Sequence, residues 1–569
     1  MAGPVHYEVY IRKTPAAPWS LLMATEDRGN AVETAEDLLR DDRAAAIRVT
    51  KETLDPDTME FSSLTLLTKG APEIRRKRVV DDVHAGPACG GPHDLYTPHA
   101  RELIGRVLED WLQRQGATAF ELLHRPDLAE KLEASGVELQ HAIQKVAVPE
   151  SQAVGQPVHD LMRHYQKLAD QTIAQVTAAG KGRFPDLSER CLADVATKLA
   201  GTPDRAFVMG GAVCAMLKGA RGARARLDRL MELASRAPAE GPARALVLVV
   251  IEQLVCELVA ARTGLAEILG PSLDQGASLA AVVRMVAPRE IDALIAHDPR
   301  MTLLVPVVEG PAARLGEWLA AGEFPLLAGS LARMVLRELM SPRRLRPSDA
   351  TGEIDILRAL ATALTATSGR LLTLEEVQNA FVERSRSLVT ADFVAAYTQH
   401  CETVQAEAEA LARLCENVTG PSNKRSAARW LSACVTSLRF ETELRAGTAT
   451  AAQKLAMLAG LQRSVRAAAL SEHDTELIVA SIGVAGGVVE AEARLIAQLA
   501  RSPAPLQQKL MALLRLAAAD GAPSGPVSER ARAEAIKLFK APESRQVLSA
   551  SPEALVPLRE LMRAVGLAA

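Results

Sequence analysis

The stretch CGGPHDLYTPHARELIGRVLEDWL, residues 89–112, decides the fold because the character of the chain changes within it. Glycine and proline interrupt its first half, whereas its second half carries apolar residues at helical spacing. Thr97 is a suitable N-cap, Pro98 suits the first helical position, and Gly116 can end the helix. The apolar face of this helix is expected to comprise Leu103, Ile104, Val107, Leu108, Trp111 and Leu112. The stretch therefore predicts the end of a linker and the start of a helix.

Upstream of this point, residues 1–70 predict a small α+β module. VHYEVYIR, residues 5–12, alternates apolar and polar side chains with the period of two that is typical of a half-buried strand. The other expected elements are a strand at 19–25, a helix from Asp27, and strands at 45–53 and 59–67 that are separated by the turn Asp55-Pro56-Asp57. The order of elements is ββαββ. No period runs through residues 71–97, which we interpret as a linker.

Downstream, the chain has the pattern of a mostly α protein. Apolar segments of roughly 10–20 residues alternate with Gly, Pro or Asp, which suits antiparallel helix pairs. No fixed repeat period recurs, so we expect an irregular multi-helix array. Breaks at 343–353 and near Thr448 predict a helical body at 98–342, a second helical unit at 343–446 and a C-terminal helical unit at 447–569.

Composition limits the classes of function. The 569 residues include 3% aromatic residues and carry a net charge of −3, which gives no overall attraction to nucleic acid or to an anionic membrane. The excess of arginine and alanine is typical of a GC-rich bacterial genome. The seven cysteines form no CxxC pair and are mostly isolated in helical patterns, which favours small buried hydrophobic residues in a reducing compartment.

The most apolar stretch, residues 245–261, predicts a buried helix. Glu252, Gln253 and Glu257 interrupt it, and a membrane-spanning helix needs about 20 nearly uncharged residues. The first residues lack the basic-then-apolar order of a signal peptide. We therefore expect a cytoplasmic protein without a membrane span.

One group of residues resembles a metal site. His84, Cys89, His93 and His99 have the spacing H-x4-C-x3-H-x5-H, and Zn²⁺ accepts both histidine and cysteine. However, structural zinc sites usually contain two closely spaced pairs, and only one cysteine is present here. The favoured interpretation is that these are linker residues, with no bound metal and no cofactor.

A second group of residues is rich in arginine. Arg343, Arg344 and Arg346 precede Asp349 and Glu353 at the predicted break. Clustered guanidinium groups can bind a phosphate or an acidic partner through paired hydrogen bonds. They can equally form ion pairs within the chain. We favour internal pairing for most of the cluster, and we regard these three arginines as the best candidates for a binding surface.

No sequence motif of an enzyme is evident. The chain lacks G-x-S-x-G and H-E-x-x-H, and the glycines in 209–222 and 482–495 are better explained by close helix packing than by phosphate binding. The leading hypothesis is a non-enzymatic scaffold or adaptor whose module and helical surfaces bind protein partners. The alternative is a ligand-responsive regulator that binds an anionic nucleotide near 343–353. A third possibility is an enzyme whose site residues come from distant segments. The oligomeric state is left open.

Overall fold

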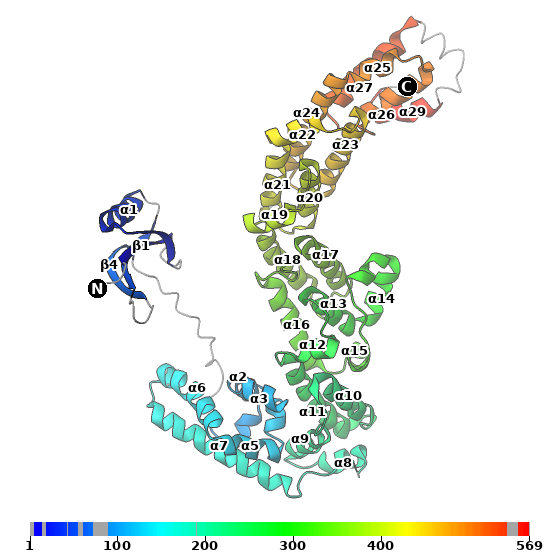
Figure 1. Ribbon diagram of the computed structural model, residues 1–569. Coiled ribbons are helices and arrows are strands. Elements are labelled where there is room, and N and C mark those ends of the chain that lie inside the picture. Colours follow the sequence, from blue (N-terminus) through cyan, green and yellow to red (C-terminus); the bar gives the residue numbers. More distant parts are fainter. Residues whose placement is uncertain are drawn as a thin grey trace. The chain divides into compact units, whose positions relative to one another are not determined.

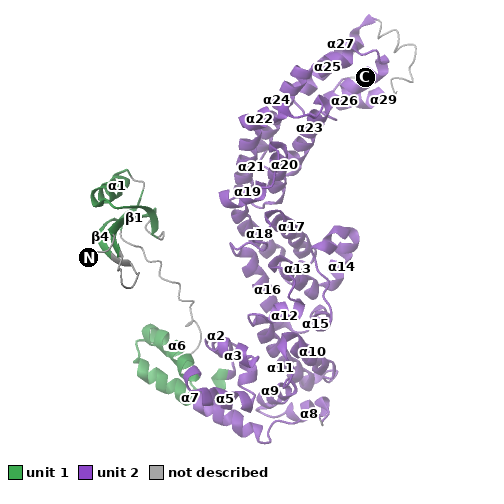
Figure 2. Cartoon of the chain, in the orientation of Figure 1, with its two compact units in different colours: residues 1–95, 139–168 green, residues 96–138, 169–569 purple. Residues whose placement is uncertain are grey.

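The computed structural model describes residues 5–13, 19–41, 44–54, 61–71, 89–188, 190–542 and 556–567. The chain is 71% helical, and these residues form 28 α-helices and one small antiparallel sheet of four strands (Figure 1). The prediction of a mostly α fold with an N-terminal α+β module is confirmed. The chain divides into two compact units, one of residues 1–95 and 139–168 and the other of residues 96–138 and 169–569 (Figure 2).

The N-terminal module has the expected ββαββ order. Its elements are β1 (Val5–Arg12), β2 (Ser20–Thr25), α1 (Arg28–Arg40), β3 (Ala46–Leu54) and β4 (Phe61–Gly70). The strands are antiparallel and lie in the order β2-β1-β3-β4. The turn predicted at Asp55-Pro56-Asp57 lies outside the described residues.

Alternating side chains give the sheet one apolar face and one polar face. Val9 and Ile11 of β1 and Ile47 of β3 point toward α1, which contributes Ala31 and Ala35 to a shared core. Since successive residues of a strand point to opposite faces, the intervening polar residues of β1 and β3 lie on the face away from α1.

Most of the chain consists of helices. Its first part contains η1 (Pro92–Tyr96), α2 (Pro98–Val107), α3 (Glu109–Gln115), α4 (Ala119–Leu122), α5 (Pro126–Ser135), α6 (Val137–Val154), α7 (Val158–Gly180), α8 (Leu192–Leu199), α9 (Arg205–Met216), α10 (Gly222–Ser235), α11 (Gly241–Ala260), α12 (Gly264–Leu269), α13 (Gln275–Val286), α14 (Pro288–His297) and η2 (Pro299–Leu303). The later helices are α15 (Pro311–Ala320), α16 (Pro325–Met340), α17 (Ala350–Ala366), α18 (Leu374–Leu388), α19 (Ala391–Thr398), α20 (Val404–Asn417), α21 (Pro421–Val435), α22 (Leu438–Ala446), α23 (Ala451–Ala467), α24 (Glu472–Ala493), α25 (Leu495–Arg501), α26 (Leu506–Ala517), α27 (Pro526–Lys540) and α29 (Val556–Ala564).

The first helix of the array begins and ends as predicted but is broken in the middle. Thr97 caps α2 by accepting a hydrogen bond from the Ala100 amide, and Gly116 ends α3 in the left-handed conformation. Leu108 leaves helical geometry between the two, so the single predicted helix is two short ones. The buried residues of α2 are Ala100 and Arg101, and the Arg101 side chain forms an ion pair with Glu257.

Helix α11 is buried, as its sequence predicts. Its two interrupting glutamates accept hydrogen bonds from backbone groups at the ends of other helices. Glu252 accepts from the Leu326 and Leu327 amides at the start of α16, at 2.6 and 3.1 Å. Glu257 accepts from the Phe120 amide at the start of α4, at 2.7 Å. These carboxylates satisfy N–H groups that have no partner inside their own helices.

The helices of the larger unit pack mainly on their near neighbours along the chain. Contacts join α10 to α11, α13 to α15 and α17, α16 to α18, α20 to α21, α23 to α24, and α26 to α27. One continuous set of buried apolar side chains runs through these helices, from Phe120 to Val565. This arrangement resembles a helical repeat protein in its local packing.

The glycines of α9 and α24 serve close packing. A Cβ on Gly211 would lie 2.3 Å from the Phe184 ring, and one on Gly483 would lie 2.5 Å from the Ser524 carbonyl oxygen. Both contacts are too short for any side chain.

Within the described residues, no single helix is both long and apolar enough to cross a membrane. Helices α15 and α16 reach the required length and composition only as a pair, and the chain bends by 106° between them.

Candidate functional site

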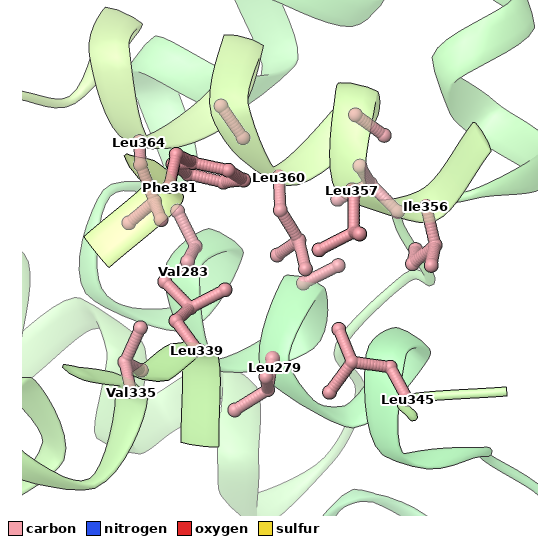
Figure 3. Close-up of a cluster of buried hydrophobic side chains, with 14 of the residues drawn as sticks. Leu279, Val283, Val335, Leu339, Leu345, Ile356, Leu357, Leu360, Leu364 and Phe381 are labelled. Carbon is pink, nitrogen blue, oxygen red and sulfur yellow. The ribbon is translucent and has the colours of Figure 1, made fainter. Parts of the chain in front are cut away.

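The candidate site is the turn of residues 341–349, which joins α16 to α17 and contains the predicted arginine cluster. Leu345 anchors this turn in the core, where it lies near Leu339 of α16 and Leu279 of α13 (Figure 3). The sequence Arg-Arg-Leu-Arg therefore places one apolar anchor among three charged side chains.

A buried arginine holds the first half of the turn. The Arg384 guanidinium, from α18, donates to the carbonyl oxygens of Ser341, Arg343 and Glu338 at 2.8, 2.5 and 3.1 Å. Its side chain is 2% exposed, and burial lowers the pKa of this guanidinium. These bonds tie the last turn of α16 to the carbonyl groups of the turn that follows it.

A buried glutamate holds the second half. Glu353 is 1% exposed and accepts a hydrogen bond from the Arg346 amide at 2.6 Å. Asp349 caps α17 by accepting from the Gly352 amide at 2.7 Å. Both carboxylates therefore bind backbone N–H groups, and the backbone of the turn is fixed at both ends.

The three predicted arginines do not share a partner. Arg346 forms an ion pair with Asp274, the N-cap residue of α13, at 2.9 Å. The Arg344 guanidinium lies over the Phe393 ring, 5.0 Å from its centroid. Arg343 is exposed, and within the described residues its side chain has no hydrogen-bond or ion-pair partner. The structure does not bring the three guanidinium groups to one common ligand position.

Two further arginines extend the exposed charge along α16. Arg333 and Arg337 are exposed and are four residues apart, so they share one face of the helix. Arg337 makes only a long contact of 3.4 Å with Glu338, and it is 75% exposed. We call the three exposed arginines Arg333, Arg337 and Arg343 the basic ridge.

The structure describes three of the four residues of the predicted metal site. The Cys89 carbonyl oxygen accepts a hydrogen bond from His164 Nε2 at 2.8 Å, and burial raises the pKa of the Cys89 thiol. His93 lies in η1, and His99 is the second residue of α2. His84 lies outside the described residues. Among those that are described, no group of three or more His, Cys, Asp or Glu side chains is placed to hold a metal ion.

Three cysteine thiols of the helical array are poorly suited to nucleophilic chemistry. Burial raises the pKa of Cys256, Cys415 and Cys434 to about 12. A thiol needs a lowered pKa to form the reactive thiolate at neutral pH.

Sequence reasoning missed a buried charge network between α4 and α10. Glu121 is fully buried and forms ion pairs with Arg125 and Arg226, at 3.3 and 3.1 Å, and it also accepts from the Thr118 amide at 3.0 Å. Thr118 followed by Glu121 has the spacing of a capping box, which was the available signal. Because all of these groups are paired within the chain, we assign the network a structural role.

Comparison of the chain with protein-family models, with curated proteins and with solved structures found no match.

Proposed function

We propose that this protein is a non-enzymatic scaffold of the cytoplasm that binds an acidic protein partner through the basic ridge. The observation that carries the proposal is the placement of Arg343. Its backbone carbonyl is held by Arg384, while its side chain is exposed and has no counter-ion among the residues that the structure describes.

The chemistry of the ridge fits a protein surface. Arginine is enriched in protein interfaces because its planar guanidinium pairs with carboxylates and also packs on apolar groups. Met340 is 49% exposed and ends the helix that carries the other two ridge arginines, so an apolar contact is available beside the charges. A fixed backbone reduces the entropy lost on binding.

The alternative of an anionic nucleotide receives less support from the geometry. Of the three arginines first considered, Arg346 is neutralised by Asp274 and Arg344 is packed against Phe393. Only Arg343 remains available, and one exposed guanidinium is a weak basis for a phosphate site.

The proposal is tested by affinity purification of the intact protein from its own host with quantitative mass spectrometry. The test variant carries Arg333→Ala, Arg337→Ala and Arg343→Ala. The control variant carries Arg163→Ala, Arg229→Ala and Arg300→Ala, which also removes three exposed arginines.

We expect a partner that is recovered with the wild type and the control but is reduced about tenfold or more with the test variant. Its recovery should also fall as salt rises, because exposed charges are screened. Equal recovery by the two variants would contradict the proposal. Saturable nucleotide binding by the purified protein, lost in Arg343→Ala, would instead favour the nucleotide-responsive regulator.

A further inference from the structure

Two arginines lie side by side on the polar face of the N-terminal sheet. In the pairing of β1 with β3, Tyr10 is opposite Arg48 and Arg12 is opposite Ala46. Arg12 and Arg48 are therefore diagonal neighbours on the face away from α1.

One indole ring covers both guanidinium groups. Trp19 precedes β2, and its ring centroid lies 4.8 Å from Cζ of Arg12 and 4.4 Å from Cζ of Arg48. A cation above an aromatic face is stabilised electrostatically. That contact does not satisfy the N–H groups in the planes of the guanidinium groups or of the indole.

Four nitrogen donors in this cluster are buried and have no hydrogen-bond partner among the described residues. They are Nε and Nη1 of Arg12, Nε of Arg48 and Nε1 of Trp19. Arg12 is 2% exposed, and its side chain donates one hydrogen bond within the described part of the chain, from Nη2 to the Ala71 carbonyl oxygen at 2.6 Å. Arginine and indole nitrogens donate but do not accept, so these groups cannot satisfy one another. Only an added acceptor can remove the cost of leaving them unpaired.

The cluster also retains its positive charge. In the described part of the chain, no carboxylate forms an ion pair with Arg12 or Arg48. On the same face, Glu8 already accepts hydrogen bonds from the Tyr10 hydroxyl at 2.5 Å and engages His6 at 3.3 Å. Two guanidinium charges of like sign under one ring repel each other, and the repulsion is stronger away from water.

We propose that Arg12, Arg48 and Trp19 form a binding site for a phosphate group. A phosphate monoester carries nearly two negative charges at neutral pH and presents three strong acceptor oxygens. It therefore matches both the two guanidinium charges and the surplus of donors. Arginine binds phosphate through paired N–H groups, which gives the contact a defined geometry. This site is separate from the basic ridge, and it does not depend on the scaffold function.

The indole must shift to admit the ligand, because the free nitrogens are shielded from solvent. Trp19 is only partly buried and lies just outside the edge strand β2, so such a shift leaves the strand pairing intact. Binding is therefore expected to change the fluorescence of the wild-type protein but not of Trp19→Phe.

The experiment is equilibrium dialysis of the full-length protein against radiolabelled inorganic phosphate at pH 7.5 and low salt. We expect saturable binding of one phosphate per chain. Arg48→Lys keeps the charge but loses the Nε donor, and Trp19→Phe keeps the ring but loses the indole N–H. Each is expected to weaken binding about tenfold, the effect of one lost charge-assisted hydrogen bond. Arg40→Gln, on α1 of the same module, removes an exposed arginine paired with Asp37 and is expected to leave phosphate binding unchanged.

Arg12→Gln is expected to abolish phosphate binding, and circular dichroism checks that the buried substitution still folds. If it does not fold, Arg48→Lys and Trp19→Phe carry the test.

The source of the phosphate group is tested with a phosphoserine peptide. Much tighter binding of this peptide than of inorganic phosphate would indicate a phosphate group on a protein chain, whereas equal affinities would indicate a free phosphate. The proposal is overturned if the folded wild type shows no saturable binding. It is also overturned if Arg48→Lys and Trp19→Phe bind as well as Arg40→Gln, or if acetate competes as effectively as phosphate.

Discussion

At the scale of single residues, Arg384 holds the turn that presents the basic ridge. Its guanidinium donates to three carbonyl oxygens near the end of α16, and the Glu338 oxygen among them also accepts from the Ser341 amide at 3.3 Å. A buried charge that donates several hydrogen bonds in this way costs much more to remove than an exposed charge.

Arg384→Met is therefore expected to lower the free energy of unfolding by about 3 kcal/mol, since it removes the donor and leaves buried carbonyls unsatisfied. The control is Arg386→Ala on the same helix, which breaks an exposed pair with Glu383 and should cost about 0–1 kcal/mol. Urea unfolding measures both. Equal, small losses would show that Arg384 does not hold the turn.

His124 makes the stability of the helical array depend on pH. Its ring is stacked on Phe120 at 4.1 Å, and burial lowers the pKa of its imidazole from 6.5 to about 4. The folded state thus favours neutral His124, whereas the unfolded state takes up a proton below pH 6.5. The resulting stabilisation is complete above pH 6.5 and is lost as pH falls toward 4.

We expect this residue to account for a loss of about 3 kcal/mol between pH 7 and pH 4, from the size of the pKa shift. Denaturant unfolding across this range should show a shallower decline in His124→Gln than in the wild type. His159→Gln, at an exposed position, is the control and should follow the wild type. Identical pH profiles for all three proteins would contradict the assignment.

At the scale of elements, charged side chains of one helix close the ends of others. Glu443 of α22 accepts from the Val404 amide at the start of α20, at 2.8 Å. Lys424 of α21 donates to the carbonyl oxygens of Cys415 and Ala468, both at 2.6 Å, at the ends of α20 and α23. These bonds satisfy free backbone N–H and C=O groups at the helix ends. They also fix the positions of neighbouring helices relative to one another.

Glu252→Ala tests this role because it removes an acceptor from two N–H groups at the start of α16. The expected loss is about 2 kcal/mol in the free energy of unfolding, as for other lost caps and unsatisfied donors. Glu130→Ala, at an exposed position of α5, should stay within about 0.5 kcal/mol of the wild type. Chemical denaturation of both variants decides the matter, and a loss from Glu252→Ala no larger than that of Glu130→Ala would refute it.

At the scale of the whole molecule, the described residues of the chain include two apolar cores that share no residue. One lies between α1 and the sheet and includes Ile47, which is fully buried. The other runs through the helical array and includes Leu360, also fully buried, in the cluster shown in Figure 3.

Separate cores predict separate responses to core substitutions. Ile47→Ala and Leu360→Ala should each cost about 2–5 kcal/mol locally. Hydrogen exchange followed by mass spectrometry should show faster exchange in β1 and β3 for Ile47→Ala and in α13 and α17 for Leu360→Ala. If either substitution accelerates exchange equally in both cores, they are not independent.

The types of element and much of their order were determined by the sequence alone. The period of two at residues 5–12 and the period of helices beyond Thr97 reflect which faces are apolar, and that property is local. The N-cap at Thr97 and the helix end at Gly116 were also predicted correctly, because each depends on residues close by in the sequence.

The tertiary structure alone decided the partners of the buried charges. The sequence shows Arg346 near Asp349 and Glu353, but its guanidinium pairs with Asp274, which lies 72 residues away. The break at Leu108 likewise accompanies an ion pair between Arg101 and Glu257. The unpaired nitrogens of Arg12, Arg48 and Trp19 are likewise a tertiary feature, because the pairing of β1 with β3 places the two arginines side by side under the indole. A charge takes whichever partner folding brings within a few ångströms, and sequence spacing does not encode that distance.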